Sequence, residues 1–330
     1  MKVRVAPAQP HCFAFGGFEI QMRAALHAAR DAGVDVQPLD PWSRDGAFDV
    51  LHLWGLESAH SLNAAWAKRS GKRVVMTALL PYLTGKERLR RALWSINGRG
   101  GAIRSLLACV DRLIVVNEQQ AQAAVSLWGF PMERIGVIPN IVADEFHAAK
   151  AKPPARKNGY LVCVGNLCRR KNQLALARAC RRARVPLLLV GEVLAGEEQY
   201  AAAIERELAL DASSRWIGGL PAESAPLLEA YLGASAFALV SHRETQPIAL
   251  LEAGTLRKPL LIADEPYARQ KFYENARLVD ARSTRAIAAG VADVLSNPSR
   301  YVPDEAALAA CDRRKVGSQY ADAYANALAL

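Results

Sequence analysis

A chain of 330 residues is long enough for two domains of ordinary size, each with its own hydrophobic core. Hydrophobic residues make up 51% and charged residues 22% of the chain, which argues against extensive disorder, and no apolar run predicts a transmembrane helix or a signal peptide. The net charge of +10 lies evenly on both halves, and no nucleic-acid-binding motif occurs, so we expect no nucleic-acid partner. We also expect a cytoplasmic protein. Its basic surface is either merely solvated or meets an anionic ligand or membrane.

Short β-type runs alternate with amphipathic helical patterns through the first half of the chain. Helices are predicted at 18–33 and 118–129 among others, and strands at 3–8, 34–39, 49–54, 73–80, 112–117 and 135–140. Such alternation is typical of βαβ units in an open parallel sheet that helices cover on both faces. Residues 1–150 are therefore predicted to form one doubly wound domain.

The polar segment Lys150 to Gly159 contains a Pro-Pro pair and no periodicity, which indicates a linker. The alternation then restarts and predicts a second domain over 151–330, with strands at 160–165, 185–191, 214–219, 236–241 and 258–263. We expect the last helix, at about 316–330, to pack across the domain junction. Because ligands bind at the carboxyl ends of parallel strands, the site is expected in a cleft between the two domains.

Two glutamates stand seven residues apart in SHRETQPIALLEAG, which runs from Ser241 to Gly254. Glu244 falls on the turn after an apolar strand, Pro247 suits the first position of the following helix, and Glu252 lies further along that helix. Both carboxylates could therefore surround one ligand, with the amides of the helix start facing its anionic part.

A second ligand candidate is the basic loop VGNLCRRKN, from Val164 to Asn172. Arg169, Arg170 and Lys171 precede a predicted helix, where cations oppose the helix dipole and an anion such as phosphate would explain them. The alternative is a solvated basic loop. Near the start of the chain, Gly16 and Gly17 either form a simple turn or let the backbone approach a ligand closely.

Four segments in this order and spacing resemble glycosyltransferase family 4. They are FGGFEIQMRAALHAARDAGVDV (15–36), the stretch ending in VIPNIV (110–142), the basic loop and the glutamate segment. The resemblance implies an α/β protein of GT-B architecture, in which two Rossmann-like, doubly wound domains face an interdomain cleft. It also implies an acceptor-binding N-terminal domain, a nucleotide-sugar-binding C-terminal domain, and transfer from a nucleotide diphosphate sugar with retention of configuration.

The resemblance further implies roles for particular residues. Catalysis would involve Glu244 near the transferred sugar, with Lys171 and Arg170 neutralising the departing diphosphate. Glu252 would bind the ribose, since a carboxylate can accept from both hydroxyls of a diol. The implied donor-binding set is Gly16, Gly17, Asn166, Arg169, Lys171, Gln246, Pro247, Ile248, Ala249 and Glu252. No metal or other cofactor is implied.

The sequence departs from the family pattern at three places. Asn166 stands where relatives often have arginine, so Lys171 would act with either Arg169 or Arg170. Gln246 and Pro247 replace the usual Phe-Gly and remove one amide donor. On the acceptor side, TALLPY (77–82) replaces a His-Asp pair, which leaves only His52 and Thr77 as candidates and no general base; His52 is otherwise a core histidine of its strand.

The segment from Lys86 to Arg104 carries six basic residues and one glutamate, with a Trp and aliphatic residues roughly on one side. Such a helix could lie on the anionic inner face of the cytoplasmic membrane and bring the enzyme to a lipid-linked acceptor. The alternative is an ordinary surface helix packed on the first domain.

The main functional hypothesis is a hexosyltransferase-like enzyme that transfers sugar to a glycan or lipid-linked acceptor in surface polysaccharide, lipopolysaccharide or glycolipid assembly. A sugar-nucleotide epimerase of the same architecture and a non-catalytic nucleotide-sugar-binding protein remain alternatives. Nicotinamide and ATP chemistry are disfavoured, because neither GxGxxG after a strand nor a complete GxxxxGK[ST] occurs. The six cysteines form no CxxC pair, so neither a zinc site nor a disulfide framework is expected.

Overall fold

The computed structural model describes residues 1–12, 16–83, 85, 99–149 and 159–330. They form two compact units: unit 1 contains Met1–Ile141 and Cys311–Leu330, and unit 2 contains Val142–Ala310. Most of the predicted linker lies outside the described residues. Each unit is a parallel sheet covered by helices, which confirms the predicted α/β class with two doubly wound domains.

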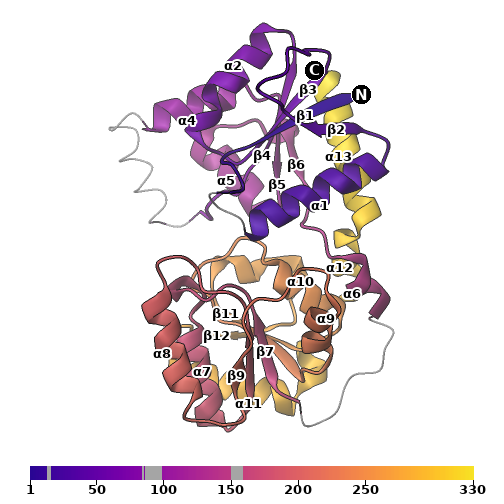
Figure 1. The fold of residues 1–330 in the computed structure, drawn as a ribbon. Coiled ribbons are helices and arrows are strands. Elements are labelled where there is room, and N and C mark those ends of the chain that lie inside the picture. Colours follow the sequence, from indigo (N-terminus) through magenta and orange to yellow (C-terminus); the bar gives the residue numbers. More distant parts are fainter. Residues whose placement is uncertain (13–15, 84, 86–98, 150–158) are drawn as a thin grey trace. The chain divides into compact units, whose positions relative to one another are not determined.

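Unit 1 is built on a parallel sheet with the strand order β2-β1-β3-β4-β5-β6 (Figure 1). Strand β1 lies between β2 and β3, so the strand order reverses there. In open parallel sheets, ligands bind beyond the strand carboxyl ends at such a point. The six strands are β1 (Lys2–Pro7), β2 (Asp35–Pro38), β3 (Val50–Trp54), β4 (Arg73–Thr77), β5 (Arg112–Val115) and β6 (Ile135–Val137).

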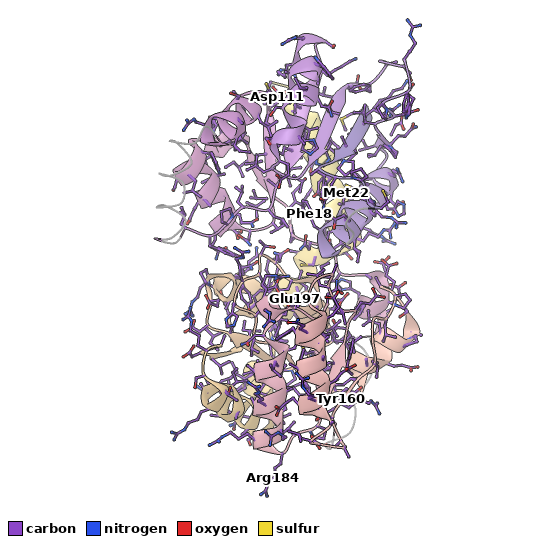
Figure 2. All side chains as sticks on the ribbon, turned by 60° about the vertical axis from the view of Figure 1, so that its left-hand side comes forward. Phe18, Met22, Asp111, Tyr160, Arg184 and Glu197 are labelled. Atoms are coloured by element: carbon purple, nitrogen blue, oxygen red, sulfur yellow. The ribbon has the colours of Figure 1, made fainter. Side chains whose placement is uncertain are left out.

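Helices bury apolar side chains against both faces of this sheet. Phe18 and Met22 project from α1 (Figure 2) and pack in a cluster with Val3 and Val5 of β1. A second cluster joins the opposite face, including Leu51 and Leu53, to the remaining helices. The helices of unit 1 before its last segment are α1 (Gly17–Asp31), α2 (Ser61–Arg69), α4 (Arg99–Ala108) and α5 (Glu118–Trp128).

The last helix, α13 (Arg313–Leu328), returns to unit 1. It contacts α1, β3 and β4, and its Val316, Tyr320 and Tyr324 belong to the same core as α1. Gly317 permits the close approach, since a Cβ there would stand 2.3 Å from the carbonyl oxygen of Ala28. The division therefore differs from the predicted 1–150 and 151–330: unit 1 ends at Ile141 and takes back the C-terminal helix as part of its core. A contact of that helix across the junction stays a prediction.

Unit 2 contains a parallel sheet with the strand order β12-β11-β10-β7-β8-β9. Strands β7 and β10 are neighbours, and the chain runs outward from them in opposite directions, which makes them the switch point of a Rossmann-type sheet. The strands are β7 (Leu161–Val164), β8 (Leu187–Val190), β9 (Arg215–Trp216), β10 (Ala236–Leu239), β11 (Leu260–Ala263) and β12 (Arg277–Val279).

The α-helices of unit 2 surround this sheet. They are α6 (Asp144–Ala149), α7 (Gln173–Ala183), α8 (Glu198–Leu208), α9 (Ala225–Leu232), α10 (Ile248–Thr255), α11 (Thr284–Ser296) and α12 (Glu305–Leu308). Short 3₁₀ helices occur in both units, with the first two in unit 1. They are η1 (Ser58–His60), η2 (Met132–Arg134), η3 (Arg169–Lys171), η4 (Pro266–Arg269), η5 (Lys271–Tyr273), η6 (Pro298–Tyr301) and η7 (Ala309–Cys311).

Candidate functional site

The loops after β7 and β10 meet at the switch point of unit 2. The β7 loop passes through Gly165 and the 3₁₀ helix η3 into α7, while the β10 loop runs from Val240 to the start of α10. In open parallel sheets ligands bind beyond the strand carboxyl ends at this place. Both predicted donor-binding segments therefore lie where the topology of unit 2 favours a ligand.

Gly165 and Gly191 let the two loops after β7 and β8 approach closely. Gly165 has φ +140°, and a Cβ there would stand 2.8 Å from Lys171 Nζ. Gly191 has φ +155°, and a Cβ would stand 2.2 Å from the carbonyl oxygen of Gly165. Glycine is required at both positions because the left-handed backbone and the missing side chain are used together. The lysine side chain thus crosses directly over the glycine that follows β7.

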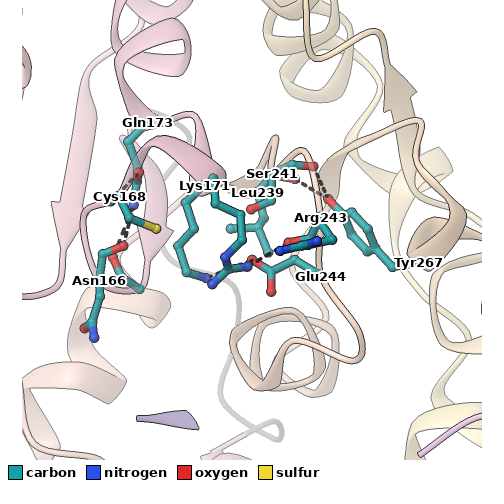
Figure 3. Close-up of polar contacts among 11 residues, drawn as sticks. Asn166, Cys168, Lys171, Gln173, Leu239, Ser241, Arg243, Glu244 and Tyr267 are labelled. Atoms are coloured by element: carbon teal, nitrogen blue, oxygen red, sulfur yellow. Dashed lines mark hydrogen bonds and ion pairs between the residues drawn. The ribbon is translucent and has the colours of Figure 1, made fainter. Parts of the chain in front are cut away.

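Lys171, Arg170 and Glu244 form one ion cluster across the switch point. Lys171 Nζ lies 3.1 Å and the Arg170 guanidinium 2.8 Å from Glu244 Oε1. Figure 3 shows the lysine and the glutamate extending toward one another from the two loops. The Lys171 and Glu244 side chains are largely buried, with exposed fractions of 12% and 10%. Residues predicted from two separate motifs are therefore brought together.

Hydrogen bonds hold the two loops in this arrangement. The His242 amide donates to the Arg170 carbonyl at 2.9 Å, and the Arg170 guanidinium donates to the Arg243 carbonyl at 2.7 Å. Asn172, whose backbone is left-handed, donates its side-chain amide to the carbonyls of Val240 and Ala281. The acceptors are all backbone carbonyls, while the side chains of Arg170 and Asn172 supply three of the four donors, so these two residues help to hold the loops together.

The charges of the cluster keep Glu244 ionised. Burial opposes ionisation, but the adjacent Lys171 and Arg170 outweigh it and hold the pKa of the Glu244 carboxyl below its usual value. The glutamate in turn balances part of the positive charge. Two cations beside a carboxylate at strand ends can bind an anionic diphosphate and leave the carboxylate facing an adjoining polar group.

Arg169 and Asn166 lie apart from this cluster. Arg169 pairs with Glu197, which stands at the start of α8 (Figure 2), and its guanidinium lies 5.5 Å from the ring centre of Tyr200. Asn166 accepts a bond from Gln173 through its backbone carbonyl at 2.9 Å. Its side chain points away from Gln173 in Figure 3. Of the two arginines left open by the sequence, Arg170 is the one beside Lys171.

The start of α10 presents backbone amides beside the cluster. Pro247 is the N-cap of α10, one position earlier than predicted, because its ψ of 124° is extended and Ile248 is the first helical residue. Ile248 and Ala249 therefore supply the amides of the first helical positions. Gln246 is 3% exposed and its side chain donates to Gln270 Oε1, so this side chain supports the loop.

Glu252 lies on α10 with its carboxyl group buried. Its Oε2 accepts a hydrogen bond of 2.6 Å from the hydroxyl of Tyr231 on α9. Burial raises the pKa of Glu252 to about 7, against the opposing effect of the Tyr231 hydrogen bond. Within the described part of the chain, no cation pairs with this carboxyl, in contrast to Glu244.

In unit 1, the predicted glycines begin α1. Gly16 is the N-cap, and its amide donates to Glu19 Oε2 at 2.9 Å, which is the backbone half of a capping box. Among the described residues, a Cβ on Gly16 would meet only this carboxylate oxygen, at an ordinary distance of 3.7 Å. Gly17 is the first helical residue, while Phe15 of the same motif lies outside the described residues. The protein itself therefore does not require a bare glycine at position 16.

The two acceptor-side candidates are bonded to each other in the core of unit 1. His52 is fully buried, with Nε2 2.9 Å from Thr77 Oγ1 and Nδ1 2.9 Å from the hydroxyl of Tyr324. Burial lowers the pKa of His52 to about 3, with a smaller contribution from His60. The ring is thus neutral and both its nitrogens have partners, as expected of a core histidine.

A small cleft nevertheless opens at the carboxyl edge of the sheet of unit 1. Trp54 at the end of β3 lines it, and its indole Nε1 is buried without a hydrogen-bond partner among the described residues. The other polar residues of the lining are Gln21, Thr77, Asn140 and Tyr320. The cleft lies at strand ends, where the sequence suggested the acceptor side.

Sequence reasoning missed Gly165, Gln173 and Tyr231. A signal for the first existed, since a glycine directly after an apolar strand indicates a tight loop. Gln173, which bonds the Cys168 amide and the Asn166 carbonyl, and Tyr231, which bonds Glu252, carry no comparable signal. Both roles depend on tertiary contacts.

The His, Cys, Asp and Glu side chains that the structure describes do not gather in groups of three or more. Among the helices that the structure describes, none combines the length and apolar character needed to span a membrane. Metal independence stays a prediction.

Two family models match the sequence. Glycosyl transferases group 1 matches residues 144–309, and Glycosyltransferase Family 4 matches residues 16–146. Both matches agree with the resemblance stated from the motifs. No curated protein is similar enough in sequence to be matched with this chain.

Solved structures of glycosyltransferases share the fold along the whole chain. The Anabaena protein HepE in complex with UDP is 15% identical with a TM-score of 0.73, covering 99% of this chain and 100% of that one. A glycosyltransferase from Rickettsia africae is 12% identical with a TM-score of 0.69, covering 99% and 98%. The lipopolysaccharide outer core galactosyltransferase WaaB is 15% identical with a TM-score of 0.66, covering 99% of both chains. These likenesses confirm the predicted GT-B fold class.

Proposed function

The chain belongs to the Glycosyl transferases group 1 family, and from this membership we propose a retaining, metal-independent transfer of a sugar from a nucleotide diphosphate sugar. The acceptor is a glycan or a lipid-linked molecule in surface polysaccharide, lipopolysaccharide or glycolipid assembly. The observation that carries the proposal is the meeting of Lys171, Arg170 and Glu244 at the switch point of unit 2.

This cluster has the chemistry that sugar transfer needs. When the bond between the sugar and the diphosphate breaks, negative charge develops on the leaving phosphate, and Lys171 and Arg170 stabilise it. The guanidinium can bind two phosphate oxygens, whereas the ammonium acts as a point charge. Glu244 is then released from its cations to hold a sugar hydroxyl or to stabilise positive charge developing on the sugar.

Other predicted residues fit the same donor. Glu252 supplies a carboxylate for the ribose, and the amides of Ile248 and Ala249 face the anionic part of the donor. Gly16 has no side chain at the N-cap of α1, and a diphosphate or sugar could therefore approach the backbone there closely. HepE has been solved with UDP-glucose, which makes uracil the first base to test.

The direct test is binding and turnover of sugar nucleotides. Thermal shift with UDP, GDP and ADP and their glucose derivatives should show one base that raises the apparent stability of the folded protein. NMR of the transferred sugar should show the anomeric configuration of the donor, and EDTA should leave the rate unchanged. The absence of any shift with every nucleotide would overturn the proposal. Binding without transfer to any glycan or lipid-linked acceptor would favour the non-catalytic alternative.

We also propose that the protein acts at the inner face of the cytoplasmic membrane. Of the predicted segment Lys86 to Arg104, residues 86–98 lie outside the described residues, and Ile103 on α4 packs in the core of unit 1. Support comes from α2, which contacts α4 and exposes Leu62 and Trp66 by 64% and 56%. An aliphatic and an aromatic residue one helical turn apart, near basic side chains, suit an anionic bilayer.

Flotation with vesicles containing phosphatidylglycerol tests this contact. Binding at low salt should fall when Arg88, Arg90 and Arg91 are replaced by Gln, and when Leu62 and Trp66 are replaced by Ser. Leu210→Ser in unit 2, where the leucine is 66% exposed, is the matched control and should float like the wild type. Equal flotation of all variants would defeat the membrane proposal and leave the transferase proposal standing.

A further inference from the structure

We propose that Tyr231 is a positioning residue that orients the carboxylate of Glu252 toward the donor diol and lowers the pH at which donor binding weakens. The inference rests on the proposed function and adds to it a residue from another helix. It follows from the way α9 and α10 pack in unit 2, and it concerns the nucleotide side of the site.

The hydroxyl of Tyr231 is fixed by the packing of its ring. The ring is fully buried, stacked on Phe237 of β10 at 5.6 Å between centres and edge-on to Phe146 of α6 at 5.4 Å. The hydroxyl donates to Glu252 Oε2 at 2.6 Å. A rigid donor at this distance selects one rotamer of the glutamate and one of its two oxygens. The tyrosine therefore determines where the other oxygen, Oε1, lies.

Glu252 needs a further partner when it is ionised. The residue is 9% exposed, and Tyr231 supplies the one hydrogen bond recorded for its carboxyl among the described residues. A buried carboxylate without a cation is unstable unless it accepts several hydrogen bonds. A ribose diol can donate two, and a charged acceptor makes such bonds stronger. The remaining oxygen, Oε1, has no hydrogen-bond partner among the described residues and is not a buried atom, so it is available to a ligand that donates.

The ionisation of Glu252 falls in the physiological range. Burial raises its pKa to about 7, the bond from Tyr231 acts in the opposite direction, and nearby Glu223 raises it further. Because the diol donates to the ionised form, donor binding lowers this pKa. By linkage, affinity is full above the pKa of the unbound protein and weakens as the pH falls below it.

Other titratable groups lie on the elements that pack against α10. Asp144, Glu145 and His147 are on α6, and Glu305 is on α12. Tyr231 and Glu223 are the titratable groups that shift the pKa of Glu252. A pH effect that belongs to Glu252 must therefore disappear in Glu252→Gln, whereas an effect of the other groups would remain.

Isothermal titration calorimetry across pH tests the inference, with UDP-glucose as the first probe. Both phosphates of a sugar nucleotide are esterified and do not titrate between about pH 5.5 and 8, so the ligand adds no proton of its own. The wild-type Kd should rise about tenfold over this range as the pH falls. In Tyr231→Phe the ring remains and the hydroxyl is lost, so the midpoint of the curve of Kd against pH should move to higher pH. In Glu252→Gln the dependence should vanish.

Tyr301→Phe is the matched control, because Tyr301 also donates to a carboxylate, Asp293 of α11, at 2.7 Å. The pH midpoint of Kd in Tyr301→Phe should equal that of the wild type. If Tyr231→Phe does not fold, 3,5-difluorotyrosine at position 231 replaces it: a stronger donor should move the midpoint to lower pH. An unchanged midpoint in a folded position-231 variant, or a wild-type Kd independent of pH, would overturn the inference. Failure of the wild type to bind any sugar nucleotide would instead count against the proposed function.

Discussion

Lys171 Nζ lies 3.1 Å from Glu244 Oε1, so the lysine after β7 and the glutamate after β10 form an ion pair across the switch point of unit 2. Arg170 reaches the same oxygen. The positive charge of the site is therefore partly neutralised by the protein itself before any ligand binds. A donor diphosphate must compete with Glu244 for these cations, which links binding of the leaving group to release of the glutamate.

Replacement of Glu244 by Ala should separate binding from transfer. We expect transfer to fall by about 10²-fold or more, the effect of removing one stabilising group from a transition state. Affinity for the nucleoside diphosphate should stay the same or increase, because Lys171 and Arg170 lose their competitor. Steady-state rates and calorimetric Kd values for the diphosphate provide the measurement.

Glu265→Ala is a suitable control for Glu244→Ala. Glu265 also pairs with an arginine, Arg282, at 3.9 Å, but it follows β11. Glu265→Ala should change neither the transfer rate nor the Kd for the diphosphate. Undiminished transfer by Glu244→Ala would show that the glutamate has no role in the reaction.

The basic residues of η3 should differ sharply in importance. Lys171→Met should weaken diphosphate binding by about ten- to a hundredfold, since a hydrogen bond to a charged group contributes about 1.5–3 kcal/mol. Arg169→Met should have little effect, because Arg169 is 68% exposed and turned to Glu197 and Tyr200. Calorimetric titration with the diphosphate gives both values. Equal losses in the two variants would mean that η3 acts as a diffuse basic loop.

Gly165→Ala should disturb the lysine without touching its charge. The φ of +140° disfavours alanine, and the added methyl group would stand 2.8 Å from Lys171 Nζ. Strain of this kind costs about 1–3 kcal/mol, and the displaced lysine should bind the diphosphate less well. Thermal unfolding and calorimetry measure the two effects.

Gly196→Ala is the comparison for Gly165→Ala, because Gly196 has φ +83° with nothing within 4 Å of the added Cβ. Gly196→Ala should lower the stability of the protein and leave its affinity for the diphosphate unchanged. If Gly165→Ala kept full affinity for the diphosphate, contact of Lys171 with this glycine would be irrelevant to binding.

Much of the architecture follows from local sequence patterns. Apolar runs such as 236–241 and amphipathic stretches such as 118–129 contain the observed β10 and α5, because buried parallel strands and half-buried helices have different periods. The hand of each crossover between parallel strands is then nearly fixed by chirality. Even the meeting of Lys171 with Glu244 is implied once β7 and β10 are neighbours.

Other features depend on contacts that no local pattern records. Strand β12 has only two apolar residues, Leu278 and Val279, and they stand between Arg277 and Asp280, so no apolar run marks it in the sequence. The return of α13 to unit 1 depends on Gly317 passing close to Ala28, far away in the sequence. Likewise, the choice between Arg169 and Arg170 is made by Glu197, which competes for one of them. Such pairings are decided by packing and electrostatics in the folded chain.

His52 should make unit 1 less stable in acid. Its pKa is about 3 in the folded chain because of burial, against an ordinary value of about 6.5 when unfolded. Below about pH 6.5 the unfolded chain binds a proton that the folded chain does not, so the free energy of unfolding decreases as the pH falls toward the folded pKa. Between about pH 7.5 and 5 this single group should cost about 2 kcal/mol.

Hydrogen exchange of the β3 amides in the wild type and in His52→Asn measures this cost, since it reports the local free energy of opening. The asparagine variant should be less stable at neutral pH, because the bonds to Thr77 and Tyr324 are altered, yet lose about 2 kcal/mol less on acidification. His60, whose pKa is also lowered, is present in both proteins and cancels from the comparison. Equal acid sensitivity would mean that His52 is not the group responsible. The same variant should keep its transfer rate within a few-fold, whereas a loss of about 10²-fold or more would return His52 to the acceptor side as a proton-transfer group.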